Sequence, residues 1–221
     1  SELARRLLSE ATPAEVTPIA SARVANRTAL GLRLRPQEPQ TTIDHVDVWA
    51  DRSTAVPLRV AVYGKGASTP ILSTTFLDFS AHVPPLSDIQ FTPAPGVRTS
   101  TGAPSDIAAA IGRAGRGTPP DQLAGVERNQ SLAPTGAIGV YGRGITEFAA
   151  VPLPRGTAAS LRKSLASAPG VTTGTGGLSG TLSGLSFVLT DPSAGQRAWL
   201  LTGTVTPDLL NAATRDLTSV K

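Results

Sequence analysis

Two histidines and a few nearby aspartates are the side chains of this sequence that could transfer protons or bind a metal ion. His45 lies between Asp44 and Asp47 in an alternating segment, whereas His82 lies alone in a proline-rich stretch. On a strand, His45 and Asp47 share one face about 7 Å apart, a spacing that suits metal ligation and equally suits a solvated polar face. Two imidazoles are too few for a three-histidine site, so any metal site depends on Asp44, Asp47 or Asp78.

The glycine-rich part of the chain indicates neither a serine nucleophile nor a phosphate-binding loop. Its nearest candidate, Gly-Leu-Ser-Gly-Thr at residues 177–181, does not match the Gly-x-Ser-x-Gly pattern of a nucleophile elbow. Residues 174–184 lack Gly-x-Gly-x-x-Gly spacing and a phosphate-binding lysine, so we interpret residues 168–185 as a mobile loop. Cysteine is absent, which excludes disulfides, thiolate nucleophiles and cysteine-based metal sites. We therefore expect that this protein is not an enzyme and binds no cofactor. Catalysis ranks behind the two binding functions that are described below.

The positive charge of the chain is dispersed. Its formal net charge is +4 and its pI is about 10.1, with single basic residues scattered among Ala, Gly and Pro. Nucleic-acid sites usually gather Lys and Arg into stripes beside aromatic side chains, and only 4% of this chain is aromatic. The composition therefore predicts no nucleic-acid partner and fits attraction to an anionic membrane surface better.

The segment 46–62 has the clearest pattern in the sequence, that of a β-hairpin. Apolar residues alternate with polar ones in both arms, and the polar run at residues 51–54 supplies the reversal. Trp49 falls on the opposite phase to Val46 and Val48, so both faces of the sheet carry side chains that gain from burial.

This hairpin carries the signature Trp-x-Asp-x-x-Thr-x-x-Pro-Leu-Arg from Trp49 to Arg59. It resembles a hairpin of the LolA/RseB-like group of extracytoplasmic bacterial proteins, and residues 24–36 resemble the strand pair that precedes it. Ala55 and Asn26 stand where the group usually has glycine, which reaches positive φ without steric cost. Members of the group are lipoprotein carriers and envelope-stress regulators built on a strongly curved antiparallel sheet. The resemblance therefore implies binding rather than catalysis.

The whole pattern predicts an α+β fold in two parts. Residues 1–80 are expected to be the C-terminal part of a curved antiparallel sheet domain, a partial LolA-like half-barrel, with a helix over residues 1–10. The predicted strands of this antiparallel meander cover residues 19–24, 29–35, 43–50, 58–63 and 71–79. Residues 81–104 are rich in proline and are predicted to be a linker.

Residues 105–221 are expected to form a smaller sheet-and-helix domain of β-β-α-β-β-α order, entered through a short helix at residues 105–114. Its predicted elements cover residues 137–141, 145–151, 157–168, 185–190, 197–205 and 207–219. The last helix is the best specified, because Thr206 suits the N-cap and Pro207 suits the first turn.

The resemblance implies a concave ligand surface on the curved sheet, and Trp49, Tyr63 and Phe76 are the candidate residues of that surface. Ordinary packing of Trp49 at a hairpin end is the alternative interpretation. The implied function is a non-catalytic regulator similar to RseB-type envelope-stress proteins, with a membrane-protein partner such as an anti-sigma factor. The alternative is a LolA-like carrier of lipid or acyl chains, which needs an apolar cavity of about several hundred cubic ångströms.

The chain contains no methionine, even at position 1, so we expect a processed or trimmed product with further sequence upstream of Ser1. No apolar run approaches the roughly 20 residues of a membrane-spanning helix. The resemblance favours an extracytoplasmic location with a membrane anchor outside this chain. It also implies that upstream strands, a partner chain or the second domain cover the open edge of the first sheet.

Overall fold

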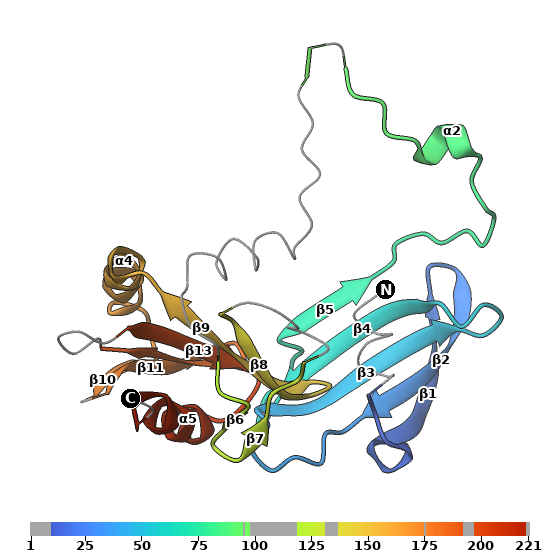
Figure 1. Cartoon of the computed structure of the whole chain (residues 1–221). Helices are drawn as coiled ribbons and strands as arrows, with labels where there is room; N and C mark the ends of the chain where they lie inside the picture. Colours follow the sequence, from blue (N-terminus) through green and yellow to red (C-terminus); the bar gives the residue numbers. More distant parts are fainter. Residues whose placement is uncertain are drawn as a thin grey trace.

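The computed structural model describes residues 10–94, 96–97, 119–130, 137–174, 176–191 and 197–219. Within these ranges the chain is an α+β protein with two main antiparallel sheets, each of which is seen in Figure 1. The helix predicted at residues 105–114 lies outside the described residues, as does all of the helix predicted at residues 1–10 except Glu10. No helix in the described part combines the length and the apolar character that a bilayer crossing requires.

The first sheet is the predicted antiparallel meander, in the order β1-β2-β3-β4-β5. Its strands are β1 (Val16–Val24), β2 (Arg27–Leu34), β3 (Ile43–Asp51), β4 (Pro57–Gly64) and β5 (Leu72–Thr75), and the 3-10 turn η1 (Pro13–Glu15) precedes them. The last strand is shorter than predicted, because the backbone turns after Thr75 and the Asp78 carboxylate accepts the N–H of Phe79 at 2.8 Å. Among the described residues, β1 and β5 are the two edge strands of this sheet.

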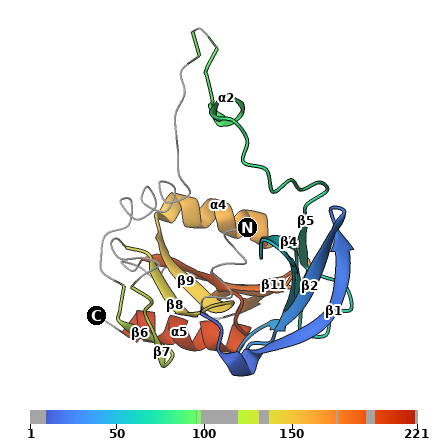
Figure 2. The ribbon, with the colours of Figure 1, turned by 90° about the vertical axis from the view of Figure 1, so that its right-hand side faces the viewer.

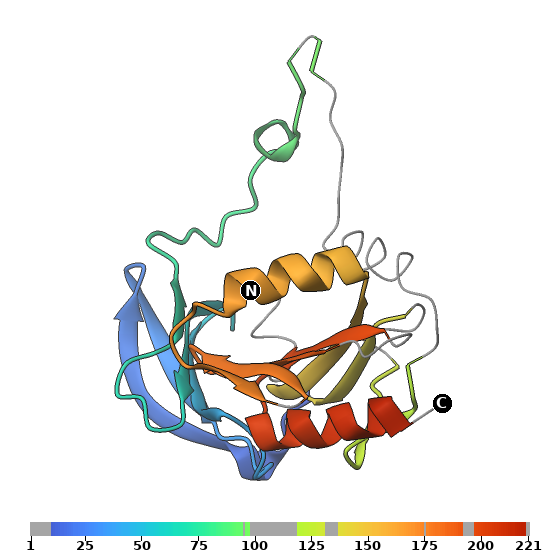
Figure 3. The ribbon, with the colours of Figure 1, turned by 90° about the vertical axis from the view of Figure 1, so that its left-hand side faces the viewer.

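Residue alternation gives this sheet one apolar and one polar face. The apolar face carries a buried cluster made of Leu34, Ile43, Val46, Val48, Val60 and Val62. Ile145 from the C-terminal half packs against this cluster. The sheet curves, and the C-terminal half lies on its inner side (Figures 2 and 3). The apolar face is therefore turned toward the rest of the protein.

The second sheet has six strands in the order β10-β11-β12-β13-β9-β8. In chain order its elements are β8 (Gly139–Arg143), β9 (Thr146–Leu153), α4 (Arg155–Leu165), β10 (Val171–Gly174), β11 (Gly177–Leu182), β12 (Leu185–Thr190), β13 (Ala198–Gly203) and α5 (Pro207–Ser219). Figure 3 shows α4 and α5 on opposite sides of this sheet. One apolar cluster under α5 includes Phe148 and Leu201, and another under α4 includes Leu178 and Leu189.

The β-β-α-β-β-α order predicted for this half is wrong, because β10 and β11 occupy the stretch that was expected to be a loop. Glycines in this stretch allow strands to approach closely. A Cβ atom on Gly177 would lie 2.0 Å from the carbonyl oxygen of Leu189 on β12, and one on Gly180 would lie 2.8 Å from that of Gly170. Gly177 and Gly180 are therefore required by the close packing of the backbone.

Backbone contacts join the two sheets where the chain enters β3 and where it leaves β13. Thr41 forms an antiparallel bridge with Val205, and the N–H of Thr42 donates to the carbonyl of Thr204 at 2.9 Å. The Thr42 hydroxyl adds a hydrogen bond of 2.6 Å to the carbonyl of Gly184. We call these paired connections the seam. The bonds of the seam, most of them between main-chain groups, fix the position of one half relative to the other.

Two smaller elements complete the described structure. A short hairpin of β6 (Gln122–Leu123) and β7 (Val126–Glu127) lies beside α5, and the N–H of Ala124 in its turn donates to the Asp216 carboxylate on α5 at 2.7 Å. The short helix α2 (Leu86–Ile89) belongs to a segment after β5 that extends away from both sheets (Figure 1).

Candidate binding pocket at the seam

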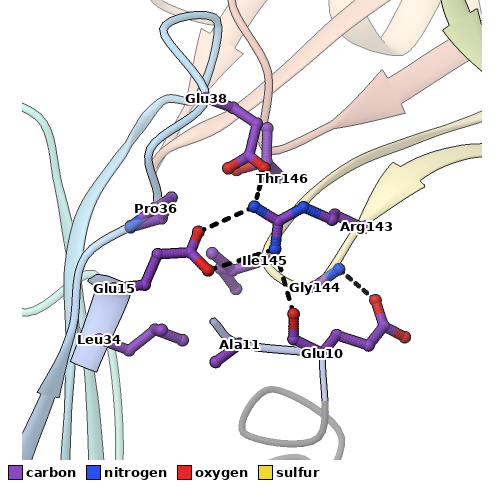
Figure 4. Close-up of a pocket in the computed structure, with 10 residues that line it drawn as sticks. All are labelled: Glu10, Ala11, Glu15, Leu34, Pro36, Glu38, Arg143, Gly144, Ile145 and Thr146. Atoms are coloured by element: carbon purple, nitrogen blue, oxygen red, sulfur yellow. Dashed lines mark hydrogen bonds and ion pairs between the residues drawn. The ribbon is translucent and has the colours of Figure 1, made fainter. Parts of the chain in front are cut away.

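Arg143 is the residue around which the candidate site is built. It ends β8 and pairs with Thr146 across a two-residue turn, in which Gly144 has a φ of 59°. Such a tight hairpin turn needs a residue that tolerates positive φ, and glycine does so without steric cost. Figure 4 shows the Arg143 side chain directed from this turn toward the carboxylates of Glu15 and Glu38. Its Nη2 atom lies 3.0 Å from Oε1 of Glu15 and 2.5 Å from Oε1 of Glu38.

Glu15 is a buried carboxylate at the end of η1, only 4% exposed. It accepts hydrogen bonds of 2.8 Å from both the N–H and the hydroxyl of Thr12, a further bond of 3.3 Å from the N–H of Gln37, and two bonds from Arg143. Burial raises the pKa of Glu15, but these donors outweigh burial and lower the pKa to about 2. Glu15 is therefore charged at any ordinary pH, and its ion pair with Arg143 persists.

The Arg143 turn also contacts Glu10, which lies three residues before η1. The Nη1 atom of Arg143 donates to the carbonyl of Glu10 at 3.1 Å, and the N–H of Gly144 donates to the Glu10 carboxylate. Arg143 thus connects the β8–β9 hairpin to the start of the first sheet at several points, on the side of the seam where the pocket opens.

A pocket of about 330 Å³ opens beside Arg143. This volume lies near the lower end of the roughly 300–1,000 Å³ range that is typical of ligand sites. Its base is apolar and is formed by Val126, Tyr141, Phe148, Val205 and Leu209. Its rim is polar and includes Glu38, Gln40, Glu127 and Arg143. Residues from the β6–β7 hairpin, the β8–β9 hairpin, the seam and the start of α5 therefore converge on one pocket.

The base of the pocket is held rigidly. The Tyr141 and Phe148 rings stack with their centroids 5.1 Å apart, and the Tyr141 hydroxyl donates to the carbonyl of Pro120 at 2.7 Å. Burial raises the pKa of Tyr141 to about 12, so the phenol stays neutral and remains a donor. An apolar group that enters the pocket therefore meets a preformed surface.

The charge of the rim disfavours anions. Arg143 supplies one positive charge, and the carboxylates of Glu15 and Glu38 already neutralise it. Glu127 adds an exposed carboxylate on the other side of the pocket. The arrangement suits an apolar group whose neighbouring groups are neutral or cationic.

The three residues predicted for the ligand surface lie elsewhere. Trp49 is on the polar face of the first sheet, where its Nε1–H donates to the carbonyl of Ala20 at 3.1 Å and the Arg59 guanidinium lies 5.5 Å from its ring centroid. Tyr63 is on the same face, whereas Phe76 follows β5 and is 43% exposed. None of the three lines the pocket at the seam, and their role in ligand binding stays a prediction.

The candidate metal ligands around His45 are engaged with other side chains. The His45 ring stacks on Tyr63 at a centroid distance of 4.3 Å, and its Nδ1 atom lies 2.5 Å from the Asp44 carboxylate. Both carboxylate oxygens of Asp47 accept hydrogen bonds from Arg33, at 2.6 and 2.7 Å. In the part of the chain that the structure describes, no group of three His, Cys, Asp or Glu side chains is placed to hold a metal ion.

Reasoning from the sequence missed Arg143 and Glu15. The pattern Thr-x-x-Glu at residues 12–15 is a capping box, and it signals that Glu15 serves a turn. No local pattern connects that turn to Arg143, because the two residues are 128 positions apart in the sequence.

Comparison with known proteins gives a match at the level of structure alone. No protein-family model and no curated protein sequence matches this chain. The fold is similar to that of MucB in a Pseudomonas aeruginosa MucA/MucB complex, with a TM-score of 0.51 and 16% identity over 95% of this chain and 65% of that chain. It is also similar to MucB in complex with MucA(peri), with a TM-score of 0.52 and 17% identity over 95% of this chain and 67% of that chain. The chain thus spans about two thirds of these MucB chains, and its fold is MucB/RseB-like.

Proposed function

We propose that this protein is a non-catalytic, extracytoplasmic binding and regulatory module whose partner is a membrane protein of the anti-sigma-factor kind. The observation that carries this proposal is the likeness of its fold to MucB, which has been solved in complex with MucA. The signature from Trp49 to Arg59 supports the same class of protein independently of the coordinates.

The pocket at the seam supplies a physical reason for peptide binding. Partner proteins commonly place a bulky apolar side chain in a preformed, dry pocket, and polar groups around it exclude water and fix the register. The stacked Tyr141 and Phe148 form such a base, and Glu38 and Glu127 form part of such a rim. A peptide seated there would contact both halves of the protein at once.

Calorimetric titration with the extracytoplasmic segments of the anti-sigma factors encoded in the same genome tests the proposal. The variant Gln40→Trp would fill the pocket from its exposed rim, and its backbone carbonyl would still accept the N–H of Thr206. Loss of an anchor pocket costs about 2 kcal/mol or more, so we expect affinity to fall by roughly 30-fold or more. Gln90→Trp, at an exposed position beside α2, is the matched control and should bind normally.

Two results would contradict the proposal in different ways. If Gln40→Trp binds a segment as tightly as the unchanged protein, the partner does not use the pocket. If none of the segments binds the unchanged protein, the assignment to this class of regulator is wrong.

A second candidate function is favoured by the size and apolar base of the same pocket. A volume of about 330 Å³ could hold an alkyl chain, as a carrier of lipid or lipidated cargo would require. Native mass spectrometry of the purified protein should then show a bound lipid, which Gln40→Trp should displace. A protein that carries no lipid, and that does not bind a fluorescent fatty acid after purification, would exclude this function.

The proposed location can be tested separately. Fusion of the complete reading frame to a reporter that is active only outside the cytoplasm should give reporter activity in the membrane fraction. Activity confined to the cytoplasm would contradict both the location and the expected membrane anchor.

A further inference from the structure

The end of the first sheet that lies away from the seam carries a second surface, which the pocket does not involve. We call it the distal end, and it consists of residues 23–28 around the β1–β2 turn, residues 51–55 around the β3–β4 turn, Arg59, and residues 76–79 after β5. Figure 1 shows the two hairpin turns projecting from the side of the sheet opposite the C-terminal half. The distal end is therefore a protrusion that can approach a flat surface.

Arginines gather at the distal end around an open hollow of about 470 Å³. The hollow is lined by Arg23, Asn26, Arg27, Thr28, Asp51, Arg52 and Ser53. Arg27 is committed to internal contacts, because its Nε atom donates to Oδ2 of Asp51 at 2.8 Å and its Nη2 atom donates to the Ser53 hydroxyl at 2.7 Å. The guanidinium of Arg27 therefore neutralises the Asp51 carboxylate within the turn.

Arg23 and Arg52 remain available for an external anion. Both side chains are exposed, and among the described residues neither forms an ion pair. The N–H of Arg52 donates to the carbonyl of Thr28 at 3.0 Å, which ties the two hairpin turns together. The two free guanidinium groups are thus held on adjoining, well-anchored turns.

Apolar side chains lie at the same end of the sheet, next to Arg27. The Phe79 ring lies 5.8 Å from the Arg27 guanidinium and 6.0 Å from the Phe76 ring. Leu77, between them in the sequence, is 93% exposed. The distal end thus combines the exposed Leu77 and Phe76 with the free arginines Arg23 and Arg52, and such a combination favours binding at a membrane interface.

The net charge of the distal end is positive. Its arginines are Arg23, Arg27, Arg52 and Arg59, and its carboxylates are Asp51 and Asp78, which leaves a net charge of +2. Asp51 is neutralised by Arg27, whereas Asp78 accepts the N–H of Phe79 and stays exposed. The positive charge therefore exceeds the negative charge on the same surface as the exposed Leu77.

We propose that the distal end docks on an anionic phospholipid surface, with Arg23 and Arg52 on headgroup phosphates and Leu77 in the interface. Each basic residue at such a surface contributes about fivefold to the partition coefficient, which corresponds to roughly 1 kcal/mol. Because the two turns project from the same side of the sheet, their free guanidinium groups can both reach the phosphates of one flat bilayer surface. Docking in this orientation leaves the pocket at the opposite end of the sheet open to a partner.

Vesicle co-sedimentation tests this proposal with the full chain. We expect binding to vesicles of phosphatidylglycerol mixed with phosphatidylcholine, and weak binding to vesicles of phosphatidylcholine alone. The double variant Arg23→Gln/Arg52→Gln should lower the partition coefficient for the anionic vesicles by roughly 25-fold. The matched control, Arg155→Gln/Lys163→Gln, removes two exposed basic residues from α4 and should bind like the unchanged protein.

A third variant separates the apolar contribution from the charge. Leu77→Ser should weaken binding to anionic vesicles without changing its dependence on salt, because it leaves every charge in place. Equal binding of the unchanged protein to neutral and anionic vesicles, or equal losses in the two double variants, would overturn the proposal. Competition by dilute inorganic phosphate would also overturn it, because it would identify a site for a free anion. None of these variants touches the pocket, so failure here would leave the proposed partner function standing.

Discussion

The guanidinium of Arg143 meets the buried carboxylate of Glu15 at 3.0 and 3.2 Å, although the two residues are 128 positions apart in the sequence. Glu15 belongs to the turn that enters the first sheet, and Arg143 belongs to a hairpin of the second sheet. The pair therefore stabilises the arrangement of the two sheets, and not only the fold of either one.

Stability should fall in acid because Glu15 must take up a proton. The pKa of Glu15 is about 2 in the folded protein, against an ordinary value of 4.5. Its contribution is therefore complete above pH 4.5 and is lost as the pH falls toward about 2. The free energy of unfolding of the unchanged protein should exceed that of Glu15→Gln by about 1–3 kcal/mol at neutral pH, and the difference should shrink over this range.

Urea denaturation at a series of pH values measures this difference. The pKa values of Asp44 and Asp51 are also lowered, through hydrogen bonds to His45 and Arg27 respectively, so only the difference between the two proteins reports on Glu15. Asp88→Asn, on the exposed helix α2, is the control and should give a curve parallel to that of the unchanged protein. A pH-independent difference for Glu15→Gln would show that the carboxylate charge has no role.

Arg143 and Glu15 should be coupled energetically. Replacing Arg143 by Met leaves the buried Glu15 carboxylate without its ion pair, whereas the double variant Glu15→Gln/Arg143→Met removes the charge as well. We expect a coupling energy of about 1–2 kcal/mol from a double-mutant cycle, because the Arg143 side chain is 42% exposed and partly screened. Strictly additive effects would mean that the contact does not stabilise the protein.

Ala55→Gly should stabilise the β3–β4 hairpin. Ala55 has a φ of 56°, a conformation that costs about 1–2 kcal/mol for a residue with a Cβ atom, whereas glycine gives back about 0.5–1 kcal/mol in entropy. We expect a net gain of about 0.5 kcal/mol in the free energy of unfolding, measured by denaturant titration. Ala67→Gly is the control, because Ala67 lies in an exposed loop and does not have a positive φ, and it should give no gain.

Gly203→Ala should destabilise the second sheet. A Cβ atom at Gly203 would lie 2.1 Å from the carbonyl oxygen of Glu147 and 2.5 Å from Cα of Phe148, so β13 and β9 would have to separate. We expect a loss of about 2–4 kcal/mol, seen as a lower melting temperature. Gly156→Ala makes the same change on α4, where a Cβ atom meets no other group within 4 Å, and it should stabilise the protein by up to about 1 kcal/mol. Similar losses in both variants would contradict the close approach of β13 and β9.

The elements that the sequence predicts well are those whose patterns are local. The alternation in residues 43–51 and 57–64 defined β3 and β4, because one face of each strand is buried and the other carries polar side chains. The last helix, Pro207–Ser219, has the predicted bounds, since its proline, its first-turn Asp208 and its apolar stripe all act within one helix. The positive φ at Asn26 and Ala55 also agrees with the positions where the resembling group has glycine.

The remaining features depend on contacts between distant segments. Strands β10 and β11 consist mostly of small residues and bury only Gly177 and Leu178, so no apolar alternation marks them. Gly177 and Gly180 are explained only by the neighbouring carbonyls of Leu189 and Gly170. The pocket also depends on contacts between segments that are distant in the sequence. Tyr141 lies in β8, Val205 follows β13 and Gln40 precedes β3, and the seam between the two sheets brings them to one place.

The two halves of the protein are joined at the seam and again beside the pocket. Main-chain bonds at Thr42 and Thr204 tie the two halves along one line, while the ion pairs of Arg143 restrain them on the side of the pocket. A guest in the pocket contacts both halves, because Glu38 and Gln40 precede β3 whereas Tyr141 and Val205 belong to the C-terminal half. Occupancy would therefore add to the cohesion of the two sheets, so that binding and the free energy needed to separate them are linked.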